Sequence, residues 1–156
     1  MDEDNLDNED FMFDDDDDDS FERERKRRKN LPVYKKAMEI LKTVESLVES
    51  LSETDKKMYA SHLSESSLIM CAKIAGAVGS DSWLICMQNA AIVRHHAEYL
   101  LTATSGMRHM TAADKNYIMV LRTEIEEFRM LFKEWVSGFK EMDADGFDDE
   151  WGLFLR

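Results

Sequence analysis

Four stretches with apolar residues at helical spacing, and almost nothing that interrupts a helix, most constrain how this chain can fold. Between residues 31 and 140, apolar side chains recur every three or four positions, which places them along one face of an α-helix. The 156 residues include one proline, Pro32, and six glycines. Because proline and glycine are the residues least compatible with a helix interior, the sequence predicts an all-α fold.

The four stretches predict four long helices with short turns between them. The expected ranges are about 32–51, 55–78, from a cap at Ser80 or Asp81 to about 104, and from a capping box at 111–114 to about 140. Gly79 is expected in the left-handed conformation that ends a helix, and Ser105 with Gly106 is expected to stop the third helix. Long helices with short connections predict an up-down-up-down four-helix bundle over residues 30–142.

The apolar stripes also predict which side chains form the core. On the first helix these are Val33, Tyr34, Ala37, Ile40, Leu41, Val44, Leu47, Val48 and Leu51. The second contributes a thinner stripe of Tyr59, Leu63, Met70, Ile74 and Ala77. The third contributes Cys86, Ala90, Val93, Ala97 and Leu100, and the fourth contributes Ile118, Leu121, Ile125, Phe128, Phe132, Trp135 and Phe139.

Charge separates the two ends of the chain from this neutral middle. Residues 1–20 carry twelve acidic and no basic side chains, including the unbroken run Asp14, Asp15, Asp16, Asp17, Asp18 and Asp19. A basic run follows, with Arg23, Arg25, Lys26, Arg27, Arg28 and Lys29. Residues 31–140 are balanced, whereas residues 141–156 are acidic again, so the net charge of −13 belongs to the ends. We expect a disordered acidic-then-basic tail over 1–29 and a short acidic and aromatic tail over 143–156.

Motifs that carry catalytic or metal chemistry are missing from the sequence. It has no nucleophile elbow, phosphate-binding loop, dinucleotide fingerprint or zinc-protease motif, so we expect neither an enzyme nor a cofactor. Two pairs, His62 with Glu65 and His95 with Glu98, have the reverse of the Glu-x-x-His order of di-iron bundles, and we interpret them as surface pairs. The acidic segment from Glu141 resembles half of a calcium loop but lacks its closing carboxylate, so no metal is expected.

The two cysteines leave a structural and a redox interpretation open. Cys71 and Cys86 flank the turn between the second and third helices at similar distances, so they could face each other. Two small core side chains are one interpretation, and a redox pair is the other. Free thiols, the absence of a secretory signal and the absence of a membrane-spanning apolar run predict a cytoplasmic protein that does not enter a membrane.

The charged tails are the candidate partner-binding segments. The basic run is either a solvated helix extension balanced by the nearby acidic run, or a contact for RNA, DNA or an acidic protein surface. No aromatic residues for base stacking are interleaved with it. The C-terminal tail carries Trp151, Leu153 and Phe154, which either pack back on the helices or bind a partner.

Several short segments give the chain a family resemblance over about residues 31–140. They are Leu31-Pro-Val-Tyr34-Lys-Lys-Ala37, Ala72-Lys-Ile-Ala-Gly76, Asn89-Ala-Ala-Ile-Val-Arg94 and Glu124-Ile-Glu-Glu-Phe-Arg-Met-Leu131. With them the chain resembles the bacterial intervening-sequence (23S rRNA) four-helix-bundle proteins and the related accessory variability determinant of diversity-generating retroelements. The resemblance implies a noncatalytic bundle that assembles into a ring, often a pentamer, and in the retroelement relatives binds nucleic acid and a reverse transcriptase. The bundle of this chain is neutral, whereas nucleic-acid-binding relatives look basic, and no functional residue carries over.

Together these observations predict a noncatalytic cytoplasmic adaptor. Its helical bundle would self-associate into a homo-oligomer or dock on a larger complex, and its charged tails would contact a protein partner. The alternative is an RNA- or ribonucleoprotein-binding oligomer that uses the basic run at 23–29, with the acidic run at 14–19 acting as a gate.

Overall fold

The computed structural model describes residues 15–142 and 150–152, and the regular elements among these residues are all helices, with no strand. The elements are α1 (Asp15–Asn30), α2 (Pro32–Glu49), α3 (Glu53–Val78), α4 (Trp83–Met110), α5 (Lys115–Ser137) and a short 3₁₀ helix, η1 (Gly138–Glu141). The all-α prediction is confirmed. No helix in the described part of the chain is both long and apolar enough to span a bilayer.

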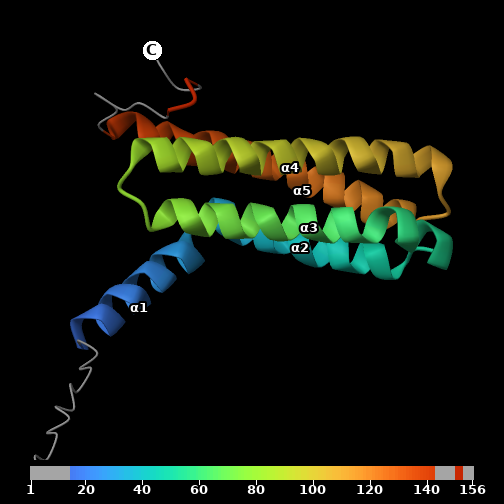
Figure 1. The fold of residues 1–156 in the computed structure, drawn as a ribbon. Coiled ribbons are helices and arrows are strands. Elements are labelled where there is room, and N and C mark those ends of the chain that lie inside the picture. Colours follow the sequence, from blue (N-terminus) through green and yellow to red (C-terminus); the bar gives the residue numbers. More distant parts are fainter. Residues whose placement is uncertain (1–14, 143–149, 153–156) are drawn as a thin grey trace, which may run out of the picture.

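Helices α2, α3, α4 and α5, with η1, form what we call the helical body. Figure 1 shows the four long helices side by side, with α1 leaving one end of the body at an angle. Helix α3 packs against both α2 and α4, and α5 packs closely on α2 but more loosely on α4. The loose α4–α5 side leaves part of the core less well covered than the other three sides.

Most of the predicted core side chains are buried. Those with no exposed surface include Ile40, Leu63, Ile74, Leu100 and Leu121, which join all four helices in one cluster. Tyr34, Leu41, Val48, Tyr59, Phe132 and Trp135 are only partly buried at the edges. Three polar side chains, Ser66, Ser67 and Thr104, are buried as well. The apolar pattern does not include them, because small hydroxyl side chains take buried positions on α3 (Ser66 and Ser67) and on α4 (Thr104).

Two expected helix-ending signals do not act as predicted. Helix α4 continues through Ser105 and Gly106 to Met110 because Thr104 and Met107 are fully buried. The hydroxyls of Thr104 and Ser105 donate to the carbonyls of Leu100 (2.7 Å) and Leu101 (3.0 Å) within the helix. Gly79 has a φ of −83°, so its predicted left-handed conformation is wrong. The Ser80 amide instead donates to the Ala77 carbonyl at 3.2 Å, a tight turn that needs no left-handed residue.

The starts of α3, α4 and α5 have side-chain caps close to the expected positions. The hydroxyl of Ser52 accepts a hydrogen bond from the Asp55 amide, and that of Ser82 accepts one from the Ile85 amide. For α5, the Asp114 carboxylate accepts from the Asn116 amide at 2.8 Å. The cap of α4 is therefore Ser82 rather than Ser80 or Asp81, and that of α5 is Asp114 rather than Thr111.

Helix α1 differs from the expected disordered tail, since residues 15–30 are helical. The acidic residues lie at its start and Arg27, Arg28 and Lys29 in its last turn, which is the order that the helix dipole favours. Asp19 lies 4.0 Å from Arg23, and Glu22 lies 3.1 Å from Arg25, one helical turn apart in each case. The order of acidic and then basic residues, from which a disordered tail was predicted, is thus suited to a helix. Residues 1–14 lie outside the described part.

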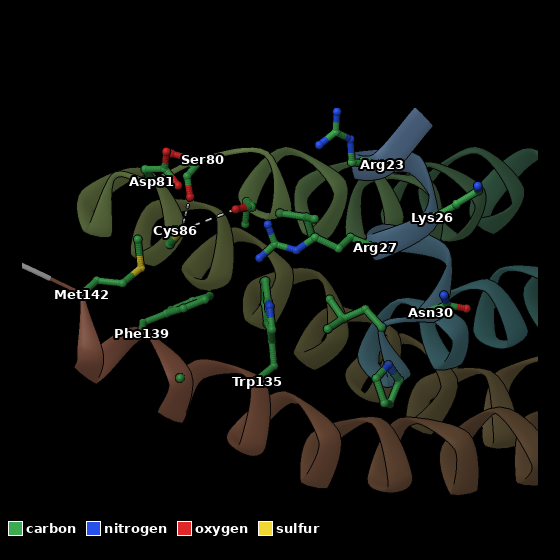
Figure 2. A pocket seen from close by; sticks show the side chains of 15 residues that line it. Arg23, Lys26, Arg27, Asn30, Ser80, Asp81, Cys86, Trp135, Phe139 and Met142 are labelled. Atoms are coloured by element: carbon green, nitrogen blue, oxygen red, sulfur yellow. Dashed lines mark hydrogen bonds between the residues drawn. The ribbon is translucent and has the colours of Figure 1, made fainter. Parts of the chain in front are cut away.

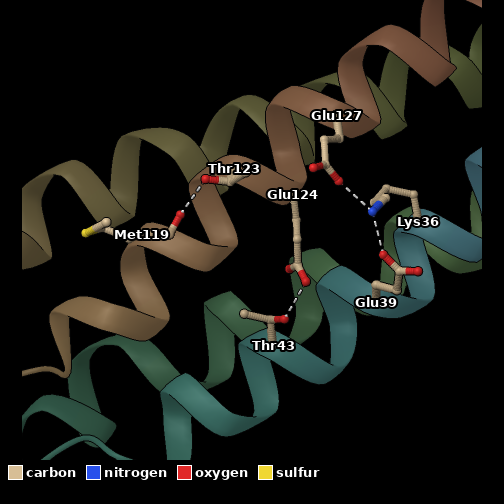
Figure 3. A network of polar contacts seen from close by, with 7 residues as sticks. All are labelled: Lys36, Glu39, Thr43, Met119, Thr123, Glu124 and Glu127. Atoms are coloured by element: carbon tan, nitrogen blue, oxygen red, sulfur yellow. Dashed lines mark hydrogen bonds and ion pairs between the residues drawn. The ribbon is translucent and has the colours of Figure 1, made fainter.

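A polar network links α2 and α5 on the outside of the core (Figure 3). The Lys36 ammonium pairs with Glu39 on its own helix and with Glu127 on α5 at 2.7 Å. Beside it, the Thr43 hydroxyl donates to Glu124 at 3.0 Å, while the other Glu124 carboxylate oxygen is buried without a hydrogen-bond partner in the described residues. Burial therefore raises the pKa of Glu124.

Replacing Lys36 with Met is expected to lower the free energy of unfolding by about 1 kcal/mol at pH 8. The hydrogen bonds to Glu127 and Glu39 raise the pKa of Lys36 from 10.5 to about 12. A raised lysine pKa means that the stabilisation is complete below 10.5 and is lost as the pH rises through 12. Urea unfolding at pH 8 and pH 11 measures this. The difference in the free energy of unfolding between wild type and Lys36→Met should be smaller at pH 11. Lys35→Met, on the exposed side of the same turn, is the control, and an equal loss there would contradict the network.

Candidate functional site

A groove with a volume of about 740 Å³ opens where α1 meets the end of the helical body, and we call it the α1 groove. Its sides come from α1, from the turn between α3 and α4, and from the end of α5 with η1 (Figure 2). These segments lie far apart in the sequence. The turn between α3 and α4 meets η1 through a buried cluster, and α1 joins them by packing against α2 and α3. The groove contains residues of the predicted basic run.

One side of the α1 groove is basic. Arg23, Lys26 and Arg27 all line it. In Figure 2 the Arg27 side chain extends toward Trp135, whereas those of Arg23 and Lys26 point outward from the rim. All three side chains are exposed. Arg23 shares its charge with Asp19, whereas Lys26 and Arg27 make no ion pair among the described residues. The groove therefore presents cations that are available to an incoming anionic group.

The floor of the α1 groove is aromatic. Trp135 and Phe139 line it, and their rings pack edge to face with centroids 5.0 Å apart. Trp135 also contacts Phe132 at 5.8 Å, and Phe132 contacts Phe128 at 6.0 Å, so a row of rings runs along α5 into the core. Because Phe139 is 8% exposed and joins the buried cluster at this end of the body, the floor is fixed by packing rather than free to move.

The turn between α3 and α4 forms the third side of the α1 groove. The Cys86 thiol lies under it and is shared between the carbonyls of Ala77 (3.5 Å) and Ser80 (3.7 Å). Burial and the nearby Asp81 carboxylate raise the pKa of Cys86, so its thiol stays protonated and holds the turn in place. Asp81 is the acidic residue of the lining, which gives the groove two more cations than anions.

The remaining basic side chains of α1 point elsewhere. Arg28 and Lys29 line a second groove, of about 500 Å³, with Tyr34, Met38 and Lys42 of α2. The Arg28 guanidinium lies 6.0 Å from the centre of the Tyr34 ring, as in a cation–π contact. Arg25 is exposed and pairs with Glu22. The structure therefore divides the predicted basic run among different faces of the helix.

The predicted acidic and C-terminal site residues are described only in part. Asp14, Leu153 and Phe154 lie outside the described residues, and Asp15 to Asp18 are described as backbone of α1. Trp151 is 85% exposed. Of the acidic run, Asp19 is the residue whose contact with the basic run is described. Since both runs share one helix, an Asp in the run can meet only the basic residues one turn away while α1 is intact.

The candidate metal and redox residues are separated in the structure. No group of three His, Cys, Asp or Glu side chains within residues 15–142 and 150–152 is arranged to hold a metal. His95 is exposed, whereas the His96 ring lies 3.1 Å from the Ser66 hydroxyl, and burial and His95 lower the pKa of His96.

Cys71 is a free, buried thiol in the main core, and burial raises its pKa to about 11. Cys86 is also free and lies in the other cluster, so the two behave as small core side chains.

The aromatic floor was not predicted to be part of a site. Trp135 and Phe139 continue the apolar stripe of α5 and look like core residues in the sequence. The one sequence feature that sets them apart is their place at the end of the fourth predicted helix. The sequence does not show whether another helix covers that end or leaves it open as a groove.

Neither the protein-family models nor the curated proteins that were searched gave a match to this chain. The resemblance to the intervening-sequence bundles therefore stays a prediction. What the grooves can bind is inferred from their own geometry and charge.

Proposed function

We propose that this protein is a noncatalytic cytoplasmic adaptor whose α1 groove binds an acidic segment of a partner protein. The observation that carries the proposal is the meeting of three exposed cations of α1 with an aromatic floor from α5. Carboxylates of the partner would pair with Arg23, Lys26 and Arg27, and an apolar side chain beside them would rest on Trp135 and Phe139. Interfaces built this way use aromatic and Arg residues as their main anchors.

The electrostatic and apolar contributions to binding in the α1 groove favour a protein segment over a nucleic acid. Exposed ion pairs alone contribute only about 0–1 kcal/mol each, so the three cations need an apolar contact to give useful affinity. The floor supplies that contact, but Trp135 and Phe139 pack against each other, which leaves their faces less available for stacking of successive bases. The acidity of the chain as a whole, −13, also opposes a polyanion more strongly than a short acidic peptide.

The proposed body is an up-down-up-down four-helix bundle. The turns between its helices are short, as Glu49 and Glu53, Val78 and Trp83, and Met110 and Lys115 are separated by three or four residues. Turns of this length join antiparallel neighbours. A rigid body of this kind would hold the floor of the groove while α1 supplies its charged side.

Charge reversal in the groove tests this proposal. The probe is a fluorescein-labelled synthetic peptide rich in Asp and Glu that carries one Trp and one Leu. Lys26→Glu with Arg27→Glu is expected to weaken its binding at least about tenfold, or about 1.4 kcal/mol, measured by fluorescence anisotropy. Arg25→Glu with Lys29→Glu makes the same charge change on other faces of α1 and should have a clearly smaller effect.

Two further measurements distinguish specific binding in the groove from general charge attraction. Replacing the Trp and Leu of the peptide with Ser should also weaken binding about tenfold or more, because the floor would lose its contact. Equal weakening by both pairs of substitutions would overturn the proposal, since it would indicate general charge attraction. Tighter binding of a single-stranded RNA of similar charge would overturn it in favour of the nucleic-acid alternative.

A further inference from the structure

A second groove, which we call the α4–α5 groove, opens on the loosely packed side of the helical body. Its volume is about 240 Å³ and its floor is apolar, formed by Ala97, Leu101, Ile125, Phe128 and Phe132. This volume is below the roughly 300–1,000 Å³ of sites that enclose a small molecule. It suits one or two large side chains that anchor a longer segment.

The rim of the α4–α5 groove is basic. Arg94 of α4 and Arg129 and Lys133 of α5 surround it, together with one carboxylate, Glu98. Arg94 pairs with Glu98 at 3.0 Å and Arg129 pairs with Glu126 at 2.7 Å, but these side chains are more than half exposed. Exposed pairs of this kind are weak, so a ligand carboxylate can replace them at little cost. The groove thus fits a segment that combines aromatic anchors with negative charge.

We infer that this groove binds the N-terminal segment, residues 1–14, of a second copy of the chain. The segment carries seven carboxylates, and its apolar residues are Leu6, Phe11, Met12 and Phe13 besides Met1. Phe11 and Phe13 are the anchors, and Asp10 and Asp14 flank them on either side, where they meet Arg129 and Lys133. Acidic side chains around an aromatic pair match a basic rim around an apolar floor.

The reach of the chain requires the partner to be another copy. Phe13 is two residues from the start of α1, so its Cα lies within about 7 Å of that start. Helix α1 has 16 residues, is therefore about 24 Å long, and points away from the helical body (Figure 1). The groove lies near Ala97, about 20 Å along α4 from its start at Trp83. While α1 is helical, Phe11 and Phe13 consequently cannot reach the groove of their own chain.

Docking of this kind joins two different surfaces, the N-terminal segment of one copy and the groove of the next. Such a heterologous contact leaves each pair with one free segment and one free groove, so assembly can continue beyond a dimer. It is independent of the α1 groove, because the two grooves share no lining residue.

Photo-crosslinking of the full chain locates the segment. The photoreactive residue benzoyl-phenylalanine replaces Phe13, and isotope-labelled chains are mixed with unlabelled ones, so that mass spectrometry separates crosslinks between copies from those within one. We expect crosslinks between copies to residues 94–101 and 125–133, and several-fold fewer when the probe replaces Asn8. Crosslinks within one chain, crosslinks to the α1 groove at 77–86 or 135–142, or none at all would overturn the inference.

Sedimentation of the full chain measures the strength of the contact. Phe11→Ser with Phe13→Ser, and separately Arg129→Glu with Lys133→Glu, should each weaken self-association at least about tenfold. Lys57→Glu with Lys115→Glu, two exposed lysines away from both grooves, is the matched control and should change it less than about threefold. Adding Asp10→Lys and Asp14→Lys to the Arg129→Glu and Lys133→Glu variant should restore association. A wild-type chain that stays monomeric at about 1 mM would refute the inference.

Discussion

Phe128→Ala is expected to lower the free energy of unfolding by about 3–5 kcal/mol. Phe128 is 1% exposed and is among the largest fully buried side chains, on the α4–α5 side where the body is least closely packed. Removing its ring deletes contacts with the main core and ends the row of rings that continues through Phe132. The cavity cannot be closed by α4 without shifting the whole helix. Urea unfolding followed by circular dichroism measures the loss.

The matched control is Met130→Ala, two residues further along the same helix. Met130 is 63% exposed, so its truncation should change the free energy of unfolding by less than about 0.5 kcal/mol. Phe128→Leu keeps most of the buried volume and should lose clearly less than Phe128→Ala. A loss below about 1 kcal/mol for Phe128→Ala would show that α4 and α5 are not joined through this ring.

Ser67→Leu is expected to cost about 1–3 kcal/mol, or more if α3 and α4 cannot separate. Ser67 has no exposed surface, and its hydroxyl donates to the Ser64 carbonyl at 3.0 Å within α3. Nearby Ser66 is 5% exposed and meets His96 of α4, so small side chains set the spacing of these two helices. Leucine places four side-chain carbon atoms where serine has one carbon and one oxygen, so the buried neighbours of Ser67 would have to move apart. Thermal and urea unfolding both report the change.

The same substitution at Ser61, which is exposed on α3, controls for the helix propensity of leucine. Ser61→Leu should be neutral within about 0.5 kcal/mol. Ser67→Ala removes the hydroxyl without adding volume and should cost less than about 1 kcal/mol. If Ser67→Leu were as stable as wild type, the close approach of α3 and α4 would not depend on small residues.

The helices and most of the core could be predicted from the sequence because burial leaves a periodic trace. The stripe from Ile118 to Phe128 on α5 was predicted and is buried residue by residue. Helix ends were predicted less well, since Ser105 and Gly106 are weak signals that the packing of Thr104 and Met107 overrides. Ser67 was missed because periodicity counts apolar residues, whereas a tight helix contact selects for size.

The α1 groove could be predicted only in its charges, and the α4–α5 groove was not predicted. The basic run was identified, but its division into Arg23, Lys26 and Arg27 at one groove and Arg28 and Lys29 at another depends on α1 being helical. The aromatic floor could not be assigned, because Trp135 has the same sequence signature whether a neighbouring helix covers it or not. The residues of the α1 groove come from segments more than a hundred positions apart, and a single sequence carries no trace of that proximity.

The α1 groove exists only while α1 is helical. Its first half leaves the body, and a helix of 16 residues held by few tertiary contacts has a low free energy of opening. When α1 frays, its three cations lose their positions around the groove and the groove loses a wall, although the core stays folded. The apparent dissociation constant of an acidic ligand is then its intrinsic value divided by the fraction of chains with an intact α1. Affinity for a partner is thereby set partly by a coil–helix equilibrium that no core residue controls.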